Sequence, residues 1–186
     1  MGRPKTFSRE EVLQKAFPVF WKHGYADTSV QELERATGVN KSGLYTEFAG
    51  KEDLFLQSLR YYLDTGQRRK QLEAQPQGWE NIERFLKFAP TNTNGQKGCF
   101  SVNSLRDLAI LPPEATAIMT QSRARLRQLL LDNVLAARPE SSTAPEEIAD
   151  LALTFYTGMC AEQNLGPARA TLTRRIDSFM KMLRQL

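Results

Sequence analysis

The spacing of apolar residues is the feature that most restricts the fold of this chain. Apolar side chains recur every three or four residues along almost the whole sequence, and no segment alternates apolar and polar residues with a period of two. The first pattern covers one face of an α-helix, whereas the second is what a half-buried strand needs. We therefore expect an all-α protein of about nine helices, with Pro and Gly residues marking the breaks between them.

Composition agrees with a water-soluble globular chain. Of 186 residues, 41% are hydrophobic and 25% are charged, which is the balance of an ordinary folded protein. The apolar runs are far shorter than the ~20 residues that cross a bilayer, and no apolar signal segment follows the start of the chain. Cys99 and Cys160 do not form a disulfide framework and suit a reducing compartment. We expect a cytoplasmic protein with no membrane partner.

The first part of the chain predicts a helix that begins at Ser8. Ser8 and Glu11 have the spacing of a capping box, in which each side chain accepts a hydrogen bond from the other residue's backbone N–H. The apolar stripe that follows contains Pro18, whose ring removes one helical hydrogen bond and predicts a kink. The helix is expected to end at Gly24, because glycine readily takes the left-handed cap conformation.

Two short helices and a tight turn follow. We expect the second helix to open at Thr28, with Thr28 and Gln31 as its cap, and to end at Thr37. Asn40 is a suitable N-cap for a third helix over residues 41–48. Short helices joined by a turn of this length have the pattern of a helix-turn-helix, whose second helix lies in the major groove of DNA.

The expected third helix has an outward polar face. Its apolar residues are spaced to pack inward, which leaves Lys41, Ser42, Thr46 and Glu47 exposed. Short polar side chains and a lysine at this place suit hydrogen bonds to base edges in the major groove. Tyr45 and Lys51 flank the helix, and their hydroxyl and ammonium groups suit phosphate oxygens.

Charge also favours a nucleic-acid partner. The net charge is +4, and the first 70 residues hold 12 basic against 9 acidic residues, so most of the excess lies there. Neutralised phosphates supply most of the non-specific affinity for DNA. Backbone N–H groups at the helix start near Thr28 are a further candidate phosphate contact.

The rest of the chain predicts longer helices. Their expected ranges are 51–72, 79–89, 100–111, 114–138, 147–165 and 172–183, with Thr143 and Glu146 capping the helix that follows residue 145. Helix 147–165 has apolar residues on more than one face, so it must be buried on two sides. This predicts a partner subunit or, alternatively, a helix through the centre of a monomer. The expected dimerisation residues are Leu153, Tyr156, Ile176, Phe179, Met180 and Leu183.

Three stretches carry a resemblance to a known family. They are Phe-Trp-Lys-His-Gly-Tyr-Ala-Asp-Thr-Ser before the second helix, Ala-Thr-Gly-Val-Asn-Lys-Ser-Gly-Leu-Tyr around the turn, and Phe-Ala-Gly-Lys-Glu-Asp-Leu-Phe after the third helix. Over residues 8 to about 56 the chain resembles the TetR family of bacterial transcription regulators. Glu34 departs from the small residue usual there, and we expect its carboxylate to reach solvent or a base such as Arg35 or Lys41.

The resemblance implies a repressor that binds a palindromic operator as a homodimer, with half-sites roughly 34 Å apart along the duplex. Residues 1–50 would form the DNA-binding domain, and residues 51–186 would bind the effector and dimerise, with helix 51–72 as the link. Arg3 would enter the minor groove and Lys5 would contact phosphate, although a frayed basic tail explains these two residues equally well.

Ligand control is the other implication, with a small apolar molecule or an electrophile as the expected inducer. Cys99 lies beside Lys97 at a helix start, where a thiol becomes reactive, but a buried cysteine is also a small hydrophobe of the core. Aromatic and methionine side chains of the effector domain are candidates to line a ligand cavity, although side chains of these kinds at helical spacing more often fill the core. The candidate sensing residues are Cys99, Phe88, Phe100, Asn103, Phe155 and Met159.

Other classes of protein find less support in the sequence. The single histidine, His23, and two distant cysteines do not make a metal site. No phosphate-binding loop, nucleophile motif or other catalytic constellation is present. We therefore expect no cofactor, no metal and no enzymatic activity. The alternatives are a thiol-based redox enzyme that uses Cys99 and an interaction protein that does not bind DNA.

Overall fold

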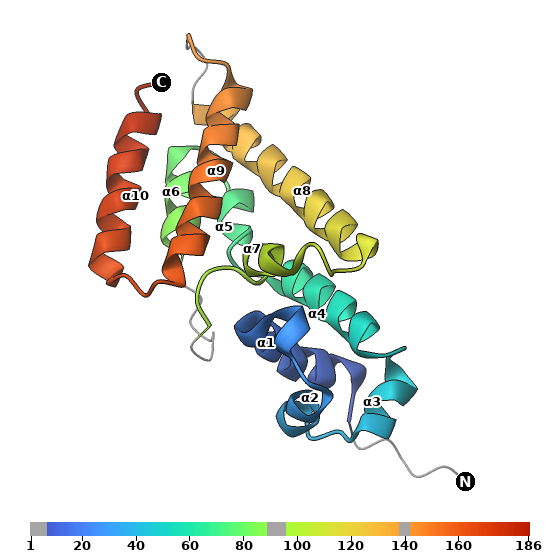
Figure 1. The fold of residues 1–186 in the computed structure, drawn as a ribbon. Helices are drawn as coiled ribbons and strands as arrows, with labels where there is room; N and C mark the ends of the chain where they lie inside the picture. Colours follow the sequence, from blue (N-terminus) through green and yellow to red (C-terminus); the bar gives the residue numbers. More distant parts are fainter. Residues whose placement is uncertain (1–6, 89–95, 138–141) are drawn as a thin grey trace. The chain divides into compact units, whose positions relative to one another are not determined.

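The computed structural model describes residues 7–88, 96–137 and 142–186, and all regular structure within these ranges is helical (Figure 1). This confirms the all-α prediction. The helices are α1 (Arg9–Asp27), α2 (Val30–Thr37), α3 (Lys41–Glu47), α4 (Lys51–Thr65), α5 (Lys70–Glu73), α6 (Trp79–Lys87), α7 (Phe100–Asn103), the 3-10 helix η1 (Ser104–Asp107), α8 (Pro113–Ala137), α9 (Pro145–Gln163) and α10 (Arg169–Leu183).

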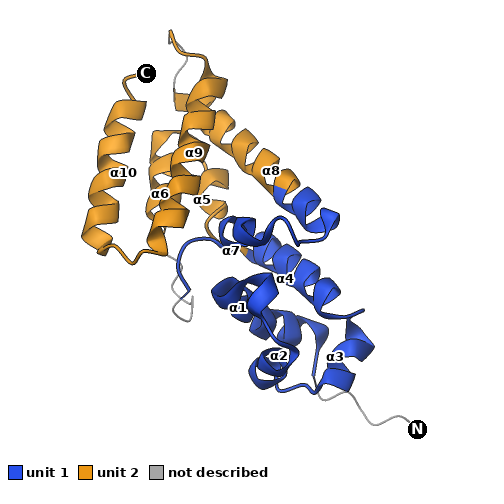
Figure 2. Ribbon diagram, in the orientation of Figure 1, with its two compact units in different colours: residues 1–65, 94–119 blue, residues 66–93, 120–186 orange. Residues whose placement is uncertain are grey.

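The chain forms two compact units (Figure 2). Unit 1 comprises residues 1–65 and 94–119, and unit 2 comprises residues 66–93 and 120–186. Unit 1 therefore contains α1 to α4, α7, η1 and the beginning of α8. Unit 2 contains α5, α6, the rest of α8, α9 and α10. These are units of packing, and the functional division into residues 1–50 and 51–186 stays a prediction.

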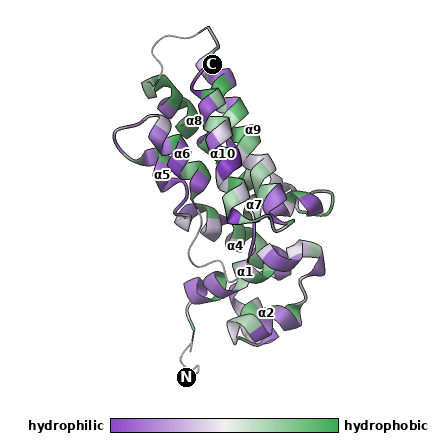
Figure 3. Cartoon of the chain, turned by 90° about the vertical axis from the view of Figure 1, so that its left-hand side faces the viewer, coloured by the Kyte–Doolittle hydropathy of each residue, from purple (hydrophilic) through white to green (hydrophobic). Residues whose placement is uncertain are grey.

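Polar and apolar residues are mixed along the helices (Figure 3). This mixture is what amphipathic helices of a water-exposed protein require, because one face packs inward and the other meets solvent. Within the described ranges, no helix has the length and apolar character needed to span a membrane.

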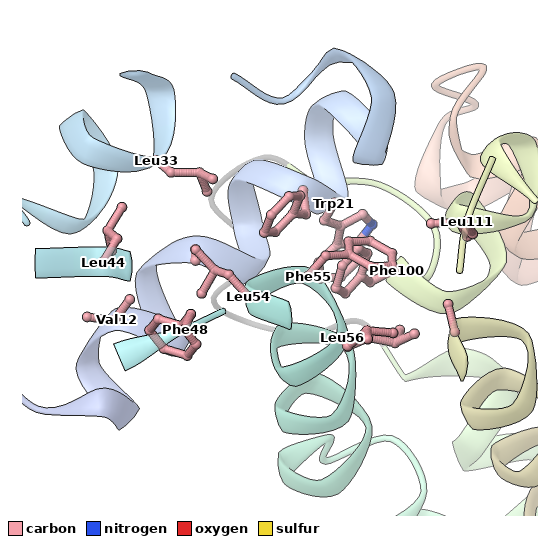
Figure 4. Packing of buried hydrophobic residues seen from close by; sticks show 14 of the residues in the cluster. Val12, Trp21, Leu33, Leu44, Phe48, Leu54, Phe55, Leu56, Phe100 and Leu111 are labelled. Atoms are coloured by element: carbon pink, nitrogen blue, oxygen red, sulfur yellow. The ribbon is translucent and has the colours of Figure 1, made fainter. Parts of the chain in front are cut away.

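Unit 1 is built around the buried face of α1, which packs against α2 and α4. Val12, Ala16 and Phe20 lie one helical turn apart on this face and are at most 1% exposed. The ring of Phe55 from α4 meets Phe20 edge-on at 5.2 Å and Phe100 at 5.7 Å between centroids. Figure 4 shows how side chains from α1 to α4 and α7 converge in this cluster.

Unit 2 has a separate core between α6, α8, α9 and α10. Its centre contains the buried amide of Asn133, which is 0% exposed. The amide nitrogen donates to the carbonyl oxygens of Leu72 and Leu129 at 2.9 and 2.8 Å, and its oxygen accepts from the Gly78 N–H at 3.0 Å. Because a buried amide without partners is unfavourable, these bonds fix the segment before α6 to α8.

Some expected boundaries are wrong. The helix expected over 51–72 is divided, because α4 ends at Thr65 and α5 begins only at Lys70. Gly66, a poor helix former, lies in this interval. The stretch 100–111 forms α7 and η1 rather than one α-helix. Helix α9 begins at Pro145, two residues before the expected Glu147, with Ala144 as its N-cap residue; the cap expected from Thr143 and Glu146 stays a prediction.

Candidate nucleic-acid interface

The start of α1 is fixed as the sequence predicts. The Ser8 hydroxyl accepts from the Glu11 N–H at 3.1 Å, and the Glu11 carboxylate accepts from the Ser8 N–H at 2.8 Å. These hydrogen bonds lower the pKa of Glu11. The helix continues through Pro18, and its non-helical residue is Gly24, with φ 85° and ψ 177°. The expected kink therefore lies at the glycine and not at the proline.

The cap of α2 is one residue later than expected. Ser29 and Glu32 form the capping box, with the Glu32 carboxylate accepting from the Ser29 N–H at 2.8 Å. Thr28 is 1% exposed, and its hydroxyl donates to the Gly24 carbonyl at 2.5 Å. The prediction of a Thr28 and Gln31 cap is thus wrong, and the Thr28 side chain faces the protein interior. The phosphate contact expected of the backbone N–H groups near Thr28 stays a prediction.

The turn between α2 and α3 is held by side chains. Gly38 is left-handed, with a φ of 75°, as a tight turn here requires. The Asn40 side chain accepts from the Gly43 N–H at 2.8 Å, which confirms Asn40 as the cap of α3. The Glu34 carboxylate accepts from the Lys41 N–H at 2.5 Å. Glu34 therefore reaches Lys41 through the backbone and acts as a second cap, which sequence reasoning did not foresee.

The other end of α3 is fixed by Arg9, which sequence reasoning missed. Its guanidinium donates to the Glu47 carbonyl at 2.6 Å and to the Gln57 side chain at 2.7 and 3.0 Å. It also lies 4.6 Å from the centre of the Phe48 ring. One arginine from α1 thus holds the end of α3 and the body of α4 together. No short-range pattern signals these partners, because they lie far from Arg9 in the sequence.

The outward face of α3 carries the residues that the sequence proposed for base contacts. Lys41, Ser42 and Thr46 are exposed, as is Tyr45, while Leu44 on the opposite face is 1% exposed. The Thr46 hydroxyl donates to the Ser42 carbonyl at 2.8 Å, which holds the Thr46 side chain against its own helix. The four side chains share one polar face on a helix of seven residues. A helix of this kind fits the major groove of DNA.

Lys51 makes contacts within the chain. Its ammonium donates to the carbonyls of Thr28 and Ala26 at 2.9 and 3.3 Å and lies 4.6 Å from the centre of the Tyr25 ring. Burial lowers the pKa of Lys51, against the opposing effect of Asp107 and Asp27. The phosphate contact proposed for Lys51 stays a prediction.

The N-terminal arm cannot be compared in the same way. Arg3 and Lys5 lie outside the described residues. Their assignment to the minor groove and to phosphate stays a prediction from the resemblance.

Three of the candidate sensing residues belong to unit 1. Cys99 is 7% exposed, and its sulfur accepts from the Tyr62 hydroxyl at 3.5 Å. Phe100 is fully buried in the unit 1 core. The Asn103 amide donates to the Lys97 carbonyl at 3.1 Å, which fixes the short loop before α7.

The other three candidate sensing residues belong to unit 2. Phe155 stacks on Phe179 at 3.8 Å between ring centroids, and Met159 is 5% exposed. Phe88 lies against Arg68, a residue that the sequence analysis did not single out. The Arg68 guanidinium is 5.4 to 5.9 Å from the ring centres of Phe85, Phe88 and Tyr156. The six candidates are therefore divided between the two units.

The expected dimerisation residues are buried within the chain itself. Their exposed fractions are Leu153 3%, Tyr156 6%, Ile176 3%, Phe179 8%, Met180 2% and Leu183 0%. These side chains are thus largely covered within one chain, and their part in a dimer stays a prediction. The large apolar residues that are exposed on α9 and the segment after it are Leu151, 45% exposed, and Leu165, 86% exposed. Gly158, which is also exposed, lies midway between them at heptad spacing.

Metal-binding chemistry finds no support in the described ranges, where no group of three or more His, Cys, Asp or Glu residues is placed to hold an ion. His23 has its Nε2 atom 3.9 Å from a Glu32 carboxylate oxygen. Both cysteines are buried.

Comparisons with known proteins agree with this geometry. A family model described as bacterial regulatory proteins, tetR family, matches residues 12–57. The transcriptional repressor ComR of Escherichia coli is 33% identical over 152 residues, which are 77% of this chain and 71% of ComR. The repressor BdcR of Escherichia coli is 25% identical over 174 residues, 89% of this chain and 83% of BdcR.

A solved structure extends the similarity to the whole fold. It is a cysteine mutant of the TetR family regulator CifR in complex with 26-bp double-strand operator DNA, with a TM-score of 0.82 and 25% identity. The match covers 97% of this chain and 98% of CifR. The family model over residues 12–57 and the 33% identity to ComR over most of both chains lead to one conclusion: this chain belongs to the TetR family of bacterial transcriptional regulators.

Proposed function

We propose that this protein is a ligand-responsive transcriptional repressor that binds a palindromic operator as a homodimer. The observation that carries the proposal is the exposed polar face of α3, on a helix whose two ends are held by Asn40, Glu34 and Arg9. A rigid helix keeps its side chains in one register on the groove, so fewer rotamers are lost on binding. ComR and BdcR are repressors, and CifR binds operator DNA, which supports the same role here.

Within the interface, different residues have different tasks. Lys41, Ser42 and Thr46 are proposed to read base edges, because they lie on the exposed face of α3. Tyr45 and Lys51 are proposed to contact phosphate, which fixes position without reading sequence. Arg3 and Lys5 would add minor-groove and phosphate contacts from the N-terminal arm.

The homodimer is proposed to form through the outer face of α9 and α10. Leu151, Gly158 and Leu165 lie at seven-residue intervals, and Met182 of α10 is 51% exposed. An added Cβ at Gly158 would meet no atom within 4 Å, so this point of α9 is open to close approach by another helix. Residues at heptad spacing pack into a helix bundle with a symmetry mate.

Effector control is proposed to change the spacing of the two DNA-binding units. A small apolar molecule or an electrophile that prefers one spacing shifts the population toward it, typically by 1–3 kcal/mol of coupling. α4 is one proposed mechanical link, since it packs on α1 within unit 1. Cys99 is the proposed site of electrophile addition; its burial also agrees with a purely structural role.

Selection of duplexes from a random-sequence pool by the purified chain, followed by affinity measurements over a range of salt, tests the proposal. We expect a palindromic site and a strong salt dependence. Lys51→Ala should reduce the salt slope by about one unit if its ammonium neutralises a phosphate. Lys181→Ala, at an exposed lysine of α10, is the matched control and should leave the slope unchanged.

Two outcomes would change the proposal. If the chain selects no duplex at low salt, DNA binding itself is wrong. If Lys51→Ala weakens binding but keeps the wild-type slope, Lys51 acts only through the carbonyls of Ala26 and Thr28 and does not contact phosphate. Thr46→Ala should instead change the preferred bases with no change of slope, because it removes a base contact and no charge.

A further inference from the structure

The junction between α1 and α2 is held from outside the helix-turn-helix. Gly24 breaks α1, and a Cβ atom at this residue would lie 2.6 Å from an Asp107 carboxylate oxygen. The backbone of α1 and the side chain of η1 are therefore in direct contact at the break. After Gly24 the chain makes one more helical turn, to Asp27, before Ser29 caps α2. The direction of this turn decides the direction in which α2 begins.

Opposite charges hold the two ends of this turn. The Tyr25 N–H donates to the Asp107 carboxylate at 2.7 Å. The Lys51 ammonium donates to the carbonyls of Ala26 and Thr28. An anion at the N–H end and a cation at the carbonyl end both complement the dipole of a helical turn. Hydrogen bonds to charged groups are also the stronger ones. Asp107 is thus a counterpart of Lys51 on the other side of the junction.

The segment that carries Asp107 follows α1 along its length. The Gln96 side chain donates to the Pro18 carbonyl at 3.0 Å, and the Trp21 indole N–H donates to the Lys97 carbonyl at 2.9 Å. Phe100 is buried beside Trp21 and the aromatic rings of α4 (Figure 4). Residues 96–107 are therefore part of the same compact unit as the helix-turn-helix, although they lie far from it in the sequence.

We propose that Asp107 is a positioning residue for operator binding and that segment 96–107 is a second connection to α1–α3 beside α4. The inference rests on the proposed function. Removal of the Asp107 carboxylate leaves the Tyr25 N–H without this acceptor. The orientation of α2 and α3 relative to α1 is then no longer fixed. Operator affinity then falls although no DNA contact is lost.

The test compares Asp107→Ala and Asp107→Asn on the duplex that the wild-type chain selects from a random pool. Asp107→Ala should lower affinity about tenfold, the effect of losing one hydrogen bond to a charged group, with the wild-type salt slope. Asp107→Asn should recover most of the affinity, because its amide oxygen still accepts from the Tyr25 N–H. Exchange of the Tyr25 amide proton should be faster in Asp107→Ala alone. Asp150→Ala, at an exposed aspartate of unit 2, is the matched control.

Wild-type affinity in Asp107→Ala, unchanged exchange at Tyr25, or failure of Asp107→Asn to recover affinity would each overturn the inference. A fall in affinity that only matches the fraction of unfolded protein would do the same. If Asp107→Ala does not fold, Asp107→Ser takes its place, because its shorter side chain does not reach the Tyr25 amide. A wild-type chain that selects no duplex overturns the proposed function instead, and exchange at Tyr25 still decides whether Asp107 holds the junction.

Discussion

Helices α3 and α9 show two different ways of fixing a helix. α3 has seven residues and buries Leu44, and its ends are held by hydrogen bonds from Asn40, Glu34 and Arg9. α9 has 19 residues, and its N-cap residue, Ala144, makes no side-chain cap hydrogen bond. Its buried residues are Ile148, Ala149, Ala152, Leu153, Tyr156, Met159 and Cys160. A helix too short to be stable alone needs its ends fixed and its one apolar anchor in place, whereas a long helix spreads its stability over many contacts.

The largest expected effect follows from the single anchor of α3. Leu44→Ala should lower the free energy of unfolding by about 2–5 kcal/mol and abolish DNA binding, because Leu44 is the residue within α3 that is buried. Leu153→Ala in α9 should have an energetic effect of the same order but leave α9 helical. Urea denaturation and amide exchange of both helices measure the two effects. Ser42→Ala, on the exposed face of α3, is the stability control and should stay within ~0.5 kcal/mol.

Equal amide exchange in α3 of wild type and Leu44→Ala would break the comparison. It would mean that the hydrogen bonds at the two ends hold α3 without its buried leucine. Loss of protection in α9 of Leu153→Ala would break it from the other side, since the remaining buried residues of α9 would then be unable to hold the helix.

The next effect separates the two faces of α9. Leu151→Glu places a charge on the exposed face and should raise the dissociation constant of the proposed dimer at least about tenfold, with little change in monomer stability. Leu153→Ala should lower the stability of the monomer and change the dissociation constant little, because Leu153 is only 3% exposed within its own chain. Sedimentation at several concentrations measures association, and Glu146→Gln at the start of α9 is the control. Dissociation of Leu153→Ala but not of Leu151→Glu would restore the dimer face first expected from the sequence.

The helix-turn-helix could be predicted from the sequence because its signals are local. Ser8 with Glu11, and Asn40 before α3, specify helix starts through atoms only three residues away. The error at α2 was one residue, because Thr28 and Ser29 are adjacent and both are capable of capping. Local chemistry therefore predicted the caps of the DNA-binding helices and left only their exact position open.

The dimer face and the α1–α2 junction could not be predicted in the same way. Periodicity shows that α9 is apolar on more than one face, but not which face its own chain covers; α10 and α6 supply that information in three dimensions. The Asp107 contact joins residues 82 positions apart, for which no spacing rule exists. Such contacts follow from the packed fold and not from any window of sequence.

The smallest expected effect concerns the second cap of α3. Glu34→Ala removes the carboxylate that accepts from the Lys41 N–H, while the Asn40 cap remains, so the free energy of unfolding should fall by about 1 kcal/mol. Glu34→Gln should lose less, because its amide oxygen still accepts this hydrogen bond. Gln31→Ala, at an exposed position of α2, controls for truncation of a polar side chain. Urea denaturation measures the change, and amide exchange at Lys41 locates it. Equal stability of Glu34→Ala and wild type would mean that Asn40 alone fixes the start of α3, and the contrast with α9, whose N-cap residue Ala144 makes no side-chain cap hydrogen bond, would then rest on one cap and not on two.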